Sequence, residues 1–450
     1  MLLPELKIIA RHAGTVLAGQ LATMAFSITD TIVAGRYADT SLAALSVGAA
    51  VYVSVFVALM GVLQALLPVW AELHGARRHA AVGQSFRQAL YLCAITIVLG
   101  MAILLFPGAI LRWTDVPHAM RLEVGQYLAV LALALPPSLL FRMYSTLNQS
   151  LGHPRLVTWL QIGSLALKIP LSIWFVFGGA GFEPQGAVGC AWATLVVNYL
   201  LLAVALFMLK TQAIYRPYAI WQRLEAPRWG QIAGFARLGV PGGLAIMVEV
   251  TSFTLMALFI ARLGTVASGS HQIATNITAA MYMLPLSISI AASARVSFWL
   301  GAGVPANARA AVTLGFSMVA ASALFLSAGL LLAREAVAHI YSHNGEVATM
   351  AVPLLGWVVV YHLFDGLQAL CVFLLRCYRV AVAPLLVYGV LLWGGGLGGG
   401  YLLAYRGLGP WEALRSPAAF WATSATMLAA TAVIFIAILR QVMKRDRRTG

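Results

Sequence analysis

Residues 353–375 read PLLGWVVVYHLFDGLQALCVFLL. This stretch holds one carboxylate, Asp365, and neither lysine nor arginine. A run of about 20 apolar residues crosses the hydrocarbon core of a bilayer as a helix. A charged side chain at that depth costs at least ~2.5–3.5 kcal/mol, so such residues usually mark a pathway for ions or substrates. The stretch therefore predicts a membrane-spanning helix with a functional group in its middle.

Long apolar runs recur along all 450 residues, of which 61% are hydrophobic and 10% charged. Asp30 and Glu249 interrupt two of these runs as Asp365 does. So much apolar surface cannot be buried in one water-soluble core, which indicates a polytopic membrane protein. We predict an all-α fold of twelve transmembrane helices, at residues 13–35, 42–71, 88–111, 124–147, 156–178, 187–209, 238–262, 270–299, 309–333, 347–375, 381–404 and 418–440.

The basic residues alternate between the predicted loops. Of the 29 lysines and arginines, 20 fall in one set of loops and seven in the intervening set. The positive-inside rule then predicts a multi-pass protein of the cell inner membrane with both termini in the cytoplasm. Because the net charge of +15 follows the loops, it does not indicate nucleic-acid binding. Residues 444–448 are expected to contact anionic membrane lipids.

Two basic residues, Arg142 and Lys168, fall inside apolar runs, and the sequence assigns Arg142 no role. The four cysteines also lie in apolar runs and lack CxxC spacing, so neither a disulfide framework nor a zinc site is indicated. We expect a monomer without a resident metal or cofactor.

The two halves of the chain resemble each other weakly. The hydrophilic stretch 211–237 divides the predicted helices six and six, and a shift of 226 places residues 35–38 on 261–264 and Gly75 on Gly301. We predict an N-lobe at 1–220, a cytoplasmic linker at 221–237 and a C-lobe at 238–450, each lobe a six-helix bundle. An even number of spans per repeat gives a pseudo-two-fold axis along the membrane normal, typical of alternating-access transporters. Duplication also occurs in channels.

Polar residues in the first half gather on predicted helix faces. Gln20, Thr23, Ser27 and Asp30 are spaced by three or four residues and share one face, which is expected to avoid lipid. Later helices of this half add Gln161, Ser164, Lys168, Ser172, Thr194 and Asn198. These residues predict a polar N-lobe cavity with one acid and one base. Asp30 and Lys168 form either a permanent ion pair or, in the interpretation we favour, a pair that titrates.

The second half presents two acids. Tyr361, Asp365 and Gln368 share a helix face, and Glu249 lies on another helix. We expect no lysine or arginine at comparable depth, so a proton or a bound cation must balance the charge. Carboxylate and phenol oxygens could transiently hold Na⁺ at Glu249, Tyr361 and Asp365. The alternative is that the two acids share a proton as a fixed structural element.

Further polar and aromatic side chains lie near these acids. Phe253, Tyr282, Trp357 and Tyr361 could offer ring faces to an organic cation, although aromatic residues at helical spacing are more often packing residues. Gln272 and Asn276 share a face of the next helix.

Four stretches carry a resemblance to a known family. They are DTIVAGR at 30–36, the segment from GVP at 239–241 to Glu249, HQIATN at 271–276 and LGAG at 300–303. Together they resemble multidrug and toxic compound extrusion (MATE) transporters, and the positions of Glu249, Tyr361 and Asp365 resemble the NorM-like branch. The likeness runs over nearly the whole chain, and the joint pattern is specific whereas each motif alone is weak.

The resemblance implies a two-lobed antiporter that exports amphiphilic, mostly cationic organic compounds in exchange for Na⁺ or H⁺. It implies that Asp30 is the coupling carboxylate of the first lobe and that Glu249, Tyr361 and Asp365 form the cation site of the second. Substrate contacts are expected at Gln272, Asn276, Phe253, Tyr282 and Gln368. The chain departs from the family where relatives read Asn-Ile-Pro-Leu-Asn: Lys168 replaces the first amide, which makes Na⁺ binding there doubtful.

Other functions fit the residues less well. A flippase for lipid-linked precursors, the main alternative, predicts extra helices and an arginine-rich cavity, whereas the second cavity here is acidic. A major-facilitator transporter would carry an acidic signature that is absent at residues 74–78. An enzyme would need a nucleophile with an oriented base or a metal cluster, and no such pattern is found, so we predict a protein that is not an enzyme. An ion channel would lack saturable, gradient-driven exchange.

Overall fold

The computed structural model describes residues 2–108, 118–179, 181–341, 345–407 and 412–449. Within this part of the chain, 12 spans are long and apolar enough to cross a membrane, so the all-α polytopic prediction is confirmed. Arg112, one of the seven basic residues in the intervening set of loops, and the side chains of residues 446–448 lie outside the described residues.

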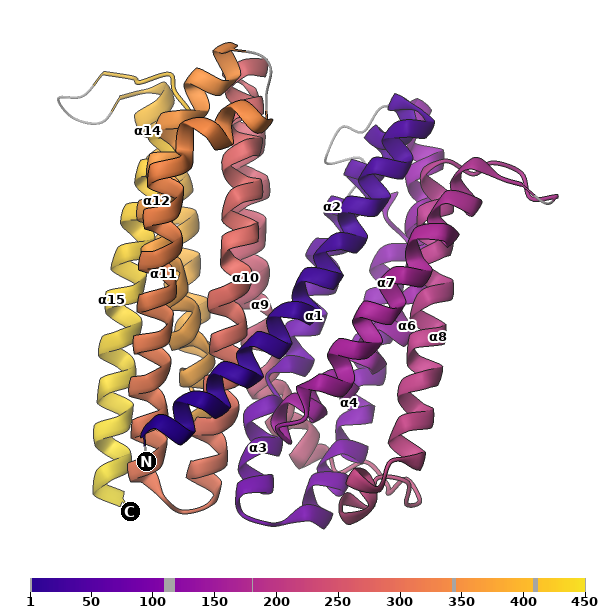
Figure 1. Cartoon of the computed structure of the whole chain (residues 1–450), viewed down its shortest axis with the longest axis vertical. Helices are drawn as coiled ribbons and strands as arrows, with labels where there is room; N and C mark the ends of the chain where they lie inside the picture. Colours follow the sequence, from indigo (N-terminus) through magenta and orange to yellow (C-terminus); the bar gives the residue numbers. More distant parts are fainter. Residues whose placement is uncertain (1, 109–117, 180, 342–344, 408–411, 450) are drawn as a thin grey trace. The chain divides into compact units, whose positions relative to one another are not determined.

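The described residues of the first half form seven α-helices and a short 3₁₀ helix (Figure 1). Their bounds are α1 Leu2–Tyr37, α2 Asp39–Gln64, α3 Leu67–Gly75, α4 His79–Leu105, α6 His118–Ser150, α7 Pro154–Phe177, α8 Ala187–Thr211 and η1 Ala213–Tyr218. The predicted helix at 42–71 is therefore divided. Pro68 lies in the first turn of α3, where the missing N–H of proline is tolerated, so a new helix starts there.

In the described part of the second half, four long helices are followed by a span in several pieces and then by the continuous helix α15. Their bounds are α9 Trp229–Ala261, α10 Thr265–Gly301, α11 Pro305–Tyr341, α12 Gly345–Cys377, α13 Val382–Tyr388, η2 Gly389–Gly398, α14 Gly399–Tyr405 and α15 Ala418–Thr449. The glycine-rich η2 is a π-helical segment. A Cβ on Gly400 would lie 2.6 Å from Phe420 of α15, so the glycine permits close helix packing.

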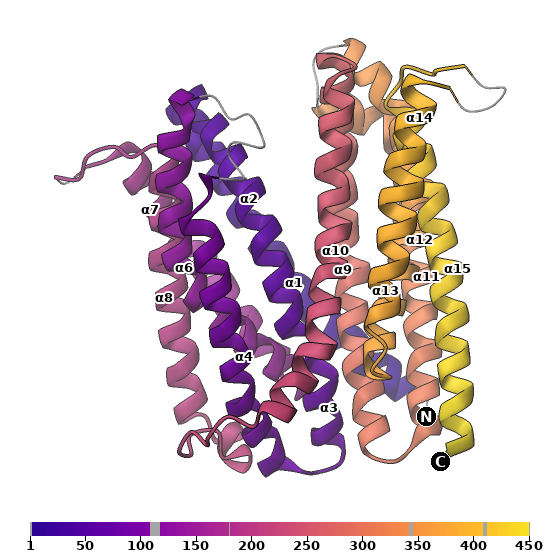
Figure 2. The ribbon, with the colours of Figure 1, turned by 180° about the vertical axis from the view of Figure 1, so that it is seen from behind.

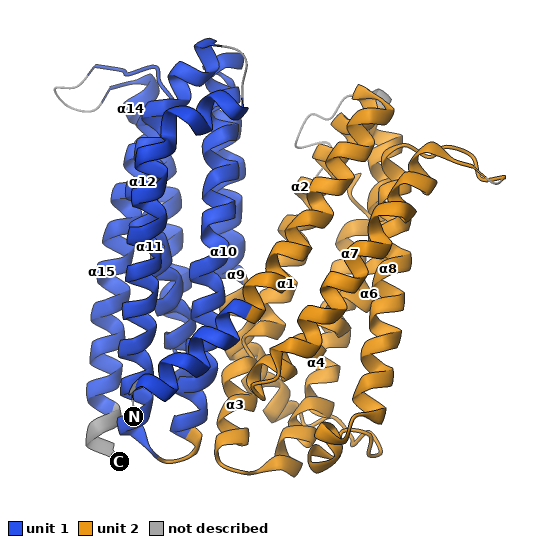
Figure 3. Ribbon diagram, viewed as in Figure 1, with its two compact units in different colours: residues 1–14, 244–300, 304–450 blue, residues 15–243, 301–303 orange. Residues whose placement is uncertain are grey.

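The chain forms two compact units (Figure 3). Unit 1 comprises residues 1–14, 244–300 and 304–450, and unit 2 comprises residues 15–243 and 301–303. These bounds differ from the expected lobes because the ends of α1 and α9 pack with the opposite half. Ile9 is fully buried in the unit 1 core, and Glu5 accepts a hydrogen bond from Arg295 Nε at 3.0 Å. Gly243 packs against Val62 within unit 2.

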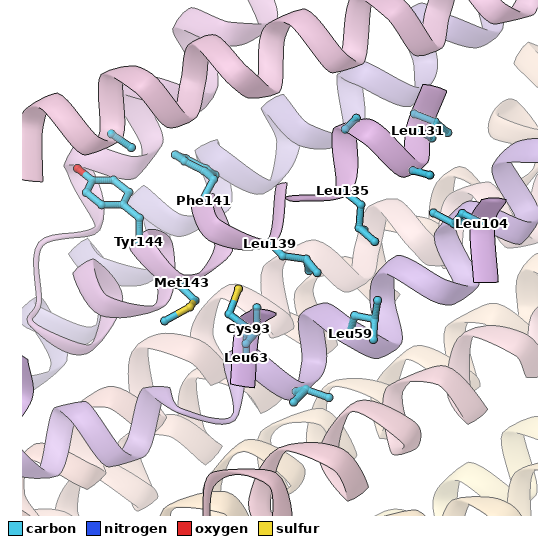
Figure 4. Packing of buried hydrophobic residues seen from close by; sticks show 14 of the residues in the cluster. Leu59, Leu63, Cys93, Leu104, Leu131, Leu135, Leu139, Phe141, Met143 and Tyr144 are labelled. Atoms are coloured by element: carbon cyan, nitrogen blue, oxygen red, sulfur yellow. The ribbon is translucent and has the colours of Figure 1, made fainter. Parts of the chain in front are cut away.

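One long helix lies at the centre of each unit. In unit 2, α6 contacts α2, α4 and α8, and in unit 1, α12 contacts α11 and α15 (Figure 2). Figure 4 shows α6 side chains such as Leu135 and Leu139 packed with Leu59 and Cys93. Most side chains in the spans of α6 and α12 are therefore removed from lipid, which is where polar groups are tolerated inside a membrane protein.

The internal repeat is visible in matching loop geometry. Arg78 N donates to Leu73 O at 3.0 Å, and 226 residues later Val304 N donates to Trp299 O at 3.0 Å. Arg77 and Gly303, also related by 226, both have positive φ angles, of 58° and 72°. A left-handed residue with this bond closes a helix C-terminus, so both halves end corresponding helices in the same way.

Candidate functional site

The two acids of unit 1 meet through one amide. Glu249 of α9 and Asp365 of α12 both accept from Gln368 Nε2, at 2.8 and 3.1 Å, and Gln368 Oε1 accepts from the Tyr388 hydroxyl. An amide nitrogen has two hydrogens, so both are used. Asp365 and Gln368 are 3% and 0% exposed. The predicted clustering of Glu249, Asp365 and Gln368 is confirmed, with Gln368 as the bridge between the acids.

A small cavity opens beside this cluster. Its volume is about 20 Å³, and its lining comprises Glu249, Ser252, Phe253, Met256, Tyr361, Leu392 and Ser424. A cavity of ≳10–15 Å³ is needed for one water molecule. The space therefore suits a water molecule or an unhydrated ion and excludes an organic compound of drug size.

Aromatic rings form one wall of the cavity. The ring of Tyr361 lies 5.8 Å from that of Phe253 and 5.8 Å from that of Trp421, in both cases edge to face. Trp421 also donates from Nε1 to His271 Nδ1 at 3.3 Å. Aromatic pairs with this geometry stabilise a packed core. Tyr361 is thus held beside the acids.

The expectation that no arginine lies at comparable depth is wrong. Arg376, which the sequence placed in a cytoplasmic loop, belongs to the last turn of α12 and is 2% exposed. Its guanidinium lies 5.1 Å over the ring of Phe373, and its charge acts on Glu249 through space. Helical side chains lean toward the N-terminus, which brings the long Arg376 side chain back along α12 toward the acids. Two carboxylates and one guanidinium share this interior.

Unit 2 holds a tight ion pair between α1 and α7. Lys168 Nζ lies 2.8 Å from Asp30 Oδ1 and donates to Cys190 O at 2.9 Å and Thr194 Oγ1 at 2.7 Å. An ammonium has three hydrogens, and here each finds an oxygen. The lysine side chain is 0% exposed, and Ser172 Oγ donates to Asp30 at 3.2 Å. The predicted proximity of Asp30, Lys168, Ser172 and Thr194 is confirmed.

Comparison with known proteins identifies the family. Residues 16–174 and 241–401 match the MatE family model. The chain belongs to the MatE family. It is similar to a probable multidrug resistance protein NorM of Aromatoleum aromaticum, 37% identical over 97% of this chain and 94% of the relative. Multidrug resistance protein PmpM of Pseudomonas aeruginosa is 30% identical over 98% of this chain and 92% of the relative.

Solved structures of MATE transporters share the fold. The eukaryotic MATE transporter AtDTX14 superposes with a TM-score of 0.86 at 19% identity, covering 99% of both chains. A MATE structure in the straight conformation gives a TM-score of 0.88 at 16% identity, covering 99% of this chain and 97% of the other. The present chain is therefore a multi-pass membrane protein with the MATE fold.

Several predicted residues belong neither to the Glu249–Asp365–Gln368 cluster nor to the Asp30–Lys168 ion pair. Gln272 Nε2 donates to Asn276 Oδ1 at 3.1 Å on an exposed face of α10, and Ser27 is exposed on α1. Asn198 donates to Ser138 Oγ at 2.8 Å. Thr23 Oγ1 accepts a hydrogen bond from Gln161, and Gln20 lines a separate cavity. Tyr282 lies close enough to Glu249 and Asp365 to interact with them electrostatically. The substrate role of Gln272 and Asn276 stays a prediction.

Sequence reasoning missed three residues of the unit 1 cluster. Tyr388 completes the hydrogen bonds of Gln368, Trp421 packs on Tyr361, and Arg376 contributes a buried charge. Tyr388 and Trp421 stand in apolar runs where an aromatic residue normally packs. Arg376 follows the last apolar residues of α12, which reads as a loop charge. No local pattern distinguishes them.

Proposed function

We propose that this chain is a secondary active antiporter that exports amphiphilic, mostly cationic organic compounds in exchange for H⁺ or Na⁺ by alternating access. The transporter family and the multidrug resistance proteins among its relatives support this function. We place the protein in the cell inner membrane as a lipid-surrounded monomer with both termini cytoplasmic. The transport cycle needs no covalent chemistry on the substrate, so we propose no enzymatic activity.

The observation that carries the coupling mechanism is the charge of the unit 1 interior. Glu249 and Asp365 form no ion pair with another described residue, and Arg376 is a buried cation whose charge acts on Glu249. Two negative groups and one positive group leave one negative charge uncompensated. Burying such a charge is costly, so the site binds one monovalent cation when it is closed to water. The expected stoichiometry at this site is one cation per cycle.

The orientation of Gln368 favours a proton over Na⁺ as that cation. Its N–H groups face the two carboxylates and its oxygen accepts from Tyr388. A sodium ion would find no oxygen ligand in Gln368 unless the amide turned over, and would otherwise depend on the oxygens of Glu249, Asp365 and Tyr361. A proton on either carboxyl requires no such rotation. Both ions remain candidates, and the gradient experiment below decides between them.

Unit 2 supplies no second coupling site in this proposal. The Lys168 ammonium already occupies the position among Asp30, Cys190 and Thr194 where a cation would bind. Asp30 is therefore neutralised by a residue of the chain itself. This favours the permanent ion pair over the titrating pair considered from the sequence.

The decisive experiment measures drug efflux from proteoliposomes under an imposed pH gradient and, separately, under a sodium gradient. We expect the wild type to respond to one gradient, and Glu249→Gln or Asp365→Asn to lose coupled efflux. Glu346→Gln is the matched control, because Glu346 lies 19 residues before Asp365 on α12, or about 28 Å along the helix. Coupled efflux that survives loss of both acids contradicts the proposal, and so does a wild type that transports passively like a channel.

A further inference from the structure

A second cavity lies in unit 2 and is not part of the ion pair. Its volume is about 10 Å³, and its lining comprises Val16 and Gln20 of α1, Arg142 and Gln149 of α6, Pro154, Val157, Thr158 and Gln161 of α7. This volume holds one water molecule or one oxygen of a larger group. The lining brings one guanidinium, three amides and a hydroxyl together inside a membrane-spanning unit.

Helix periodicity and close helix approach build the cavity. Arg142 and Gln149 are two turns apart on α6 and so share a face. Their neighbours Phe141 and Met143 belong to the apolar core (Figure 4). A Cβ on Gly19 would overlap Gln161 of α7, so glycine allows α1 to approach at this point. Thr158 Oγ1 donates to Thr15 O at 2.7 Å and fixes the two helices together.

The charge of Arg142 has no counter-charge among the described residues. Arg142 forms neither an ion pair nor a hydrogen bond with any of them. The acids of unit 2 that pair with cations are already engaged, Asp30 with Lys168 and Glu225 with Arg87. An unpaired guanidinium inside a membrane span is costly and by default marks a functional site.

A second buried group in the cavity also lacks a partner. Gln149 is 6% exposed, and its Oε1 makes no hydrogen bond within the described part of the chain, although its Nε2 donates to Ser145 at 3.2 Å. A buried acceptor without a donor costs about 1–3 kcal/mol. Gln20, Arg142 and Gln161 are only half-buried, so a ligand can reach the cavity from outside.

We propose that Arg142 and Gln149 form an anion subsite that binds the carboxylate of transported amphiphiles, including zwitterionic compounds. The cavity admits one carboxylate oxygen, to which the Arg142 guanidinium donates a charge-assisted N–H···O bond, and Gln149 Oε1 accepts from an N–H, an O–H or a bound water beside it. The inference rests on the proposed function, because it extends the substrate class of the same exporter. The acids of unit 1 alone would select only cations.

The test compares two dyes that differ in one ester. Rhodamine 110 carries a free carboxylate, and rhodamine 123 is its methyl ester. Binding to the purified full-length protein is measured by fluorescence anisotropy for the wild type, Arg142→Gln and Arg142→Lys. We expect Arg142→Gln to raise the Kd of rhodamine 110 about tenfold, from the loss of a charge-assisted hydrogen bond, and that of rhodamine 123 less than twofold. Arg142→Lys keeps the charge and retains part of the affinity.

Equal changes for both dyes, or no change for either, overturn the proposal. If Arg142→Gln does not fold, competition on the wild type decides: benzoate must displace rhodamine 110 and leave rhodamine 123 bound. Displacement of rhodamine 110 by phosphatidylglycerol in nanodiscs, without displacement by benzoate, assigns the cavity to a lipid headgroup and refutes the substrate role. A wild type that exports rhodamine 123 but does not bind rhodamine 110 refutes it too. A wild type that exports neither dye contradicts the proposed function itself.

Discussion

Replacing Lys168 by methionine is predicted to destabilise unit 2 by about 3–5 kcal/mol. Methionine fills much of the same volume without charge, so packing changes little. The variant leaves Asp30, whose side chain is 13% exposed, as a carboxylate in a membrane span that accepts from the neutral Ser172 hydroxyl at 3.2 Å and has no cation beside it among the described residues. The cost arises mainly from this uncompensated charge.

The lost hydrogen bonds contribute less. Thr194 still donates to Cys190 O at 2.9 Å, so that carbonyl keeps a partner. One neutral hydrogen bond contributes only ~0.5–1.5 kcal/mol net. The double variant Lys168→Met, Asp30→Asn removes both charges and is expected to lie within about 1.5 kcal/mol of the wild type. The coupling energy of the two substitutions is then at least ~1.5 kcal/mol, within the range measured for residues in contact.

The assay is denaturant unfolding in detergent micelles of the wild type, both single variants and the double variant. Additive effects of the two substitutions would refute the buried ion pair, as would a Lys168→Met variant as stable as the wild type. The same double variant also reports on function. If unit 1 alone couples transport, its gradient-driven efflux persists in proteoliposomes, and loss of that efflux would show that the Asp30 region takes part in coupling.

Two further predictions concern the loop that follows α8. A hydrogen bond from Arg87 holds the pKa of Glu225 below its usual range, so its stabilising effect is complete above pH about 4.5 and is lost as pH falls through the lower folded pKa. The melting temperatures of wild type and Glu225→Gln should therefore differ at neutral pH and converge in acid, and a gap that widens in acid would contradict this. Gly83→Ala should lower stability by about 1–3 kcal/mol, because a Cβ there overlaps the Tyr218 carbonyl, whereas Gly125→Ala, with open space around it, should be neutral or slightly stabilising in the same unfolding measurement. Equal effects of the two glycine substitutions would refute the steric argument.

The membrane spans and the buried acids were predictable because hydropathy is a local property of the chain. The composition of a run such as 353–375 is enough to predict that it lies in the membrane. A carboxylate within such a run can be recognised from the sequence whichever helices it packs against. The pairing of Asp30 with Lys168 was also predictable, because both residues lie inside apolar runs where a single charge would be unstable. The clustering of Asp365 with Gln368 follows from their spacing of three on one helix.

Tertiary structure alone decided which faces of different helices meet. The sequence gives no sign that Tyr388 completes the hydrogen bonds of Gln368, or that Arg376 turns back into the interior and offsets one of the two acids. Helix periodicity predicts which face of a helix a side chain lies on, but it does not predict which other helix packs against that face. Residues 1–14 pack with unit 1 for the same reason, since their partners are brought near only by the fold. The sequence showed Arg142 as a charged residue inside an apolar run. The cavity that it lines with Gln149 is formed by the packing of α1, α6 and α7, which the sequence did not predict.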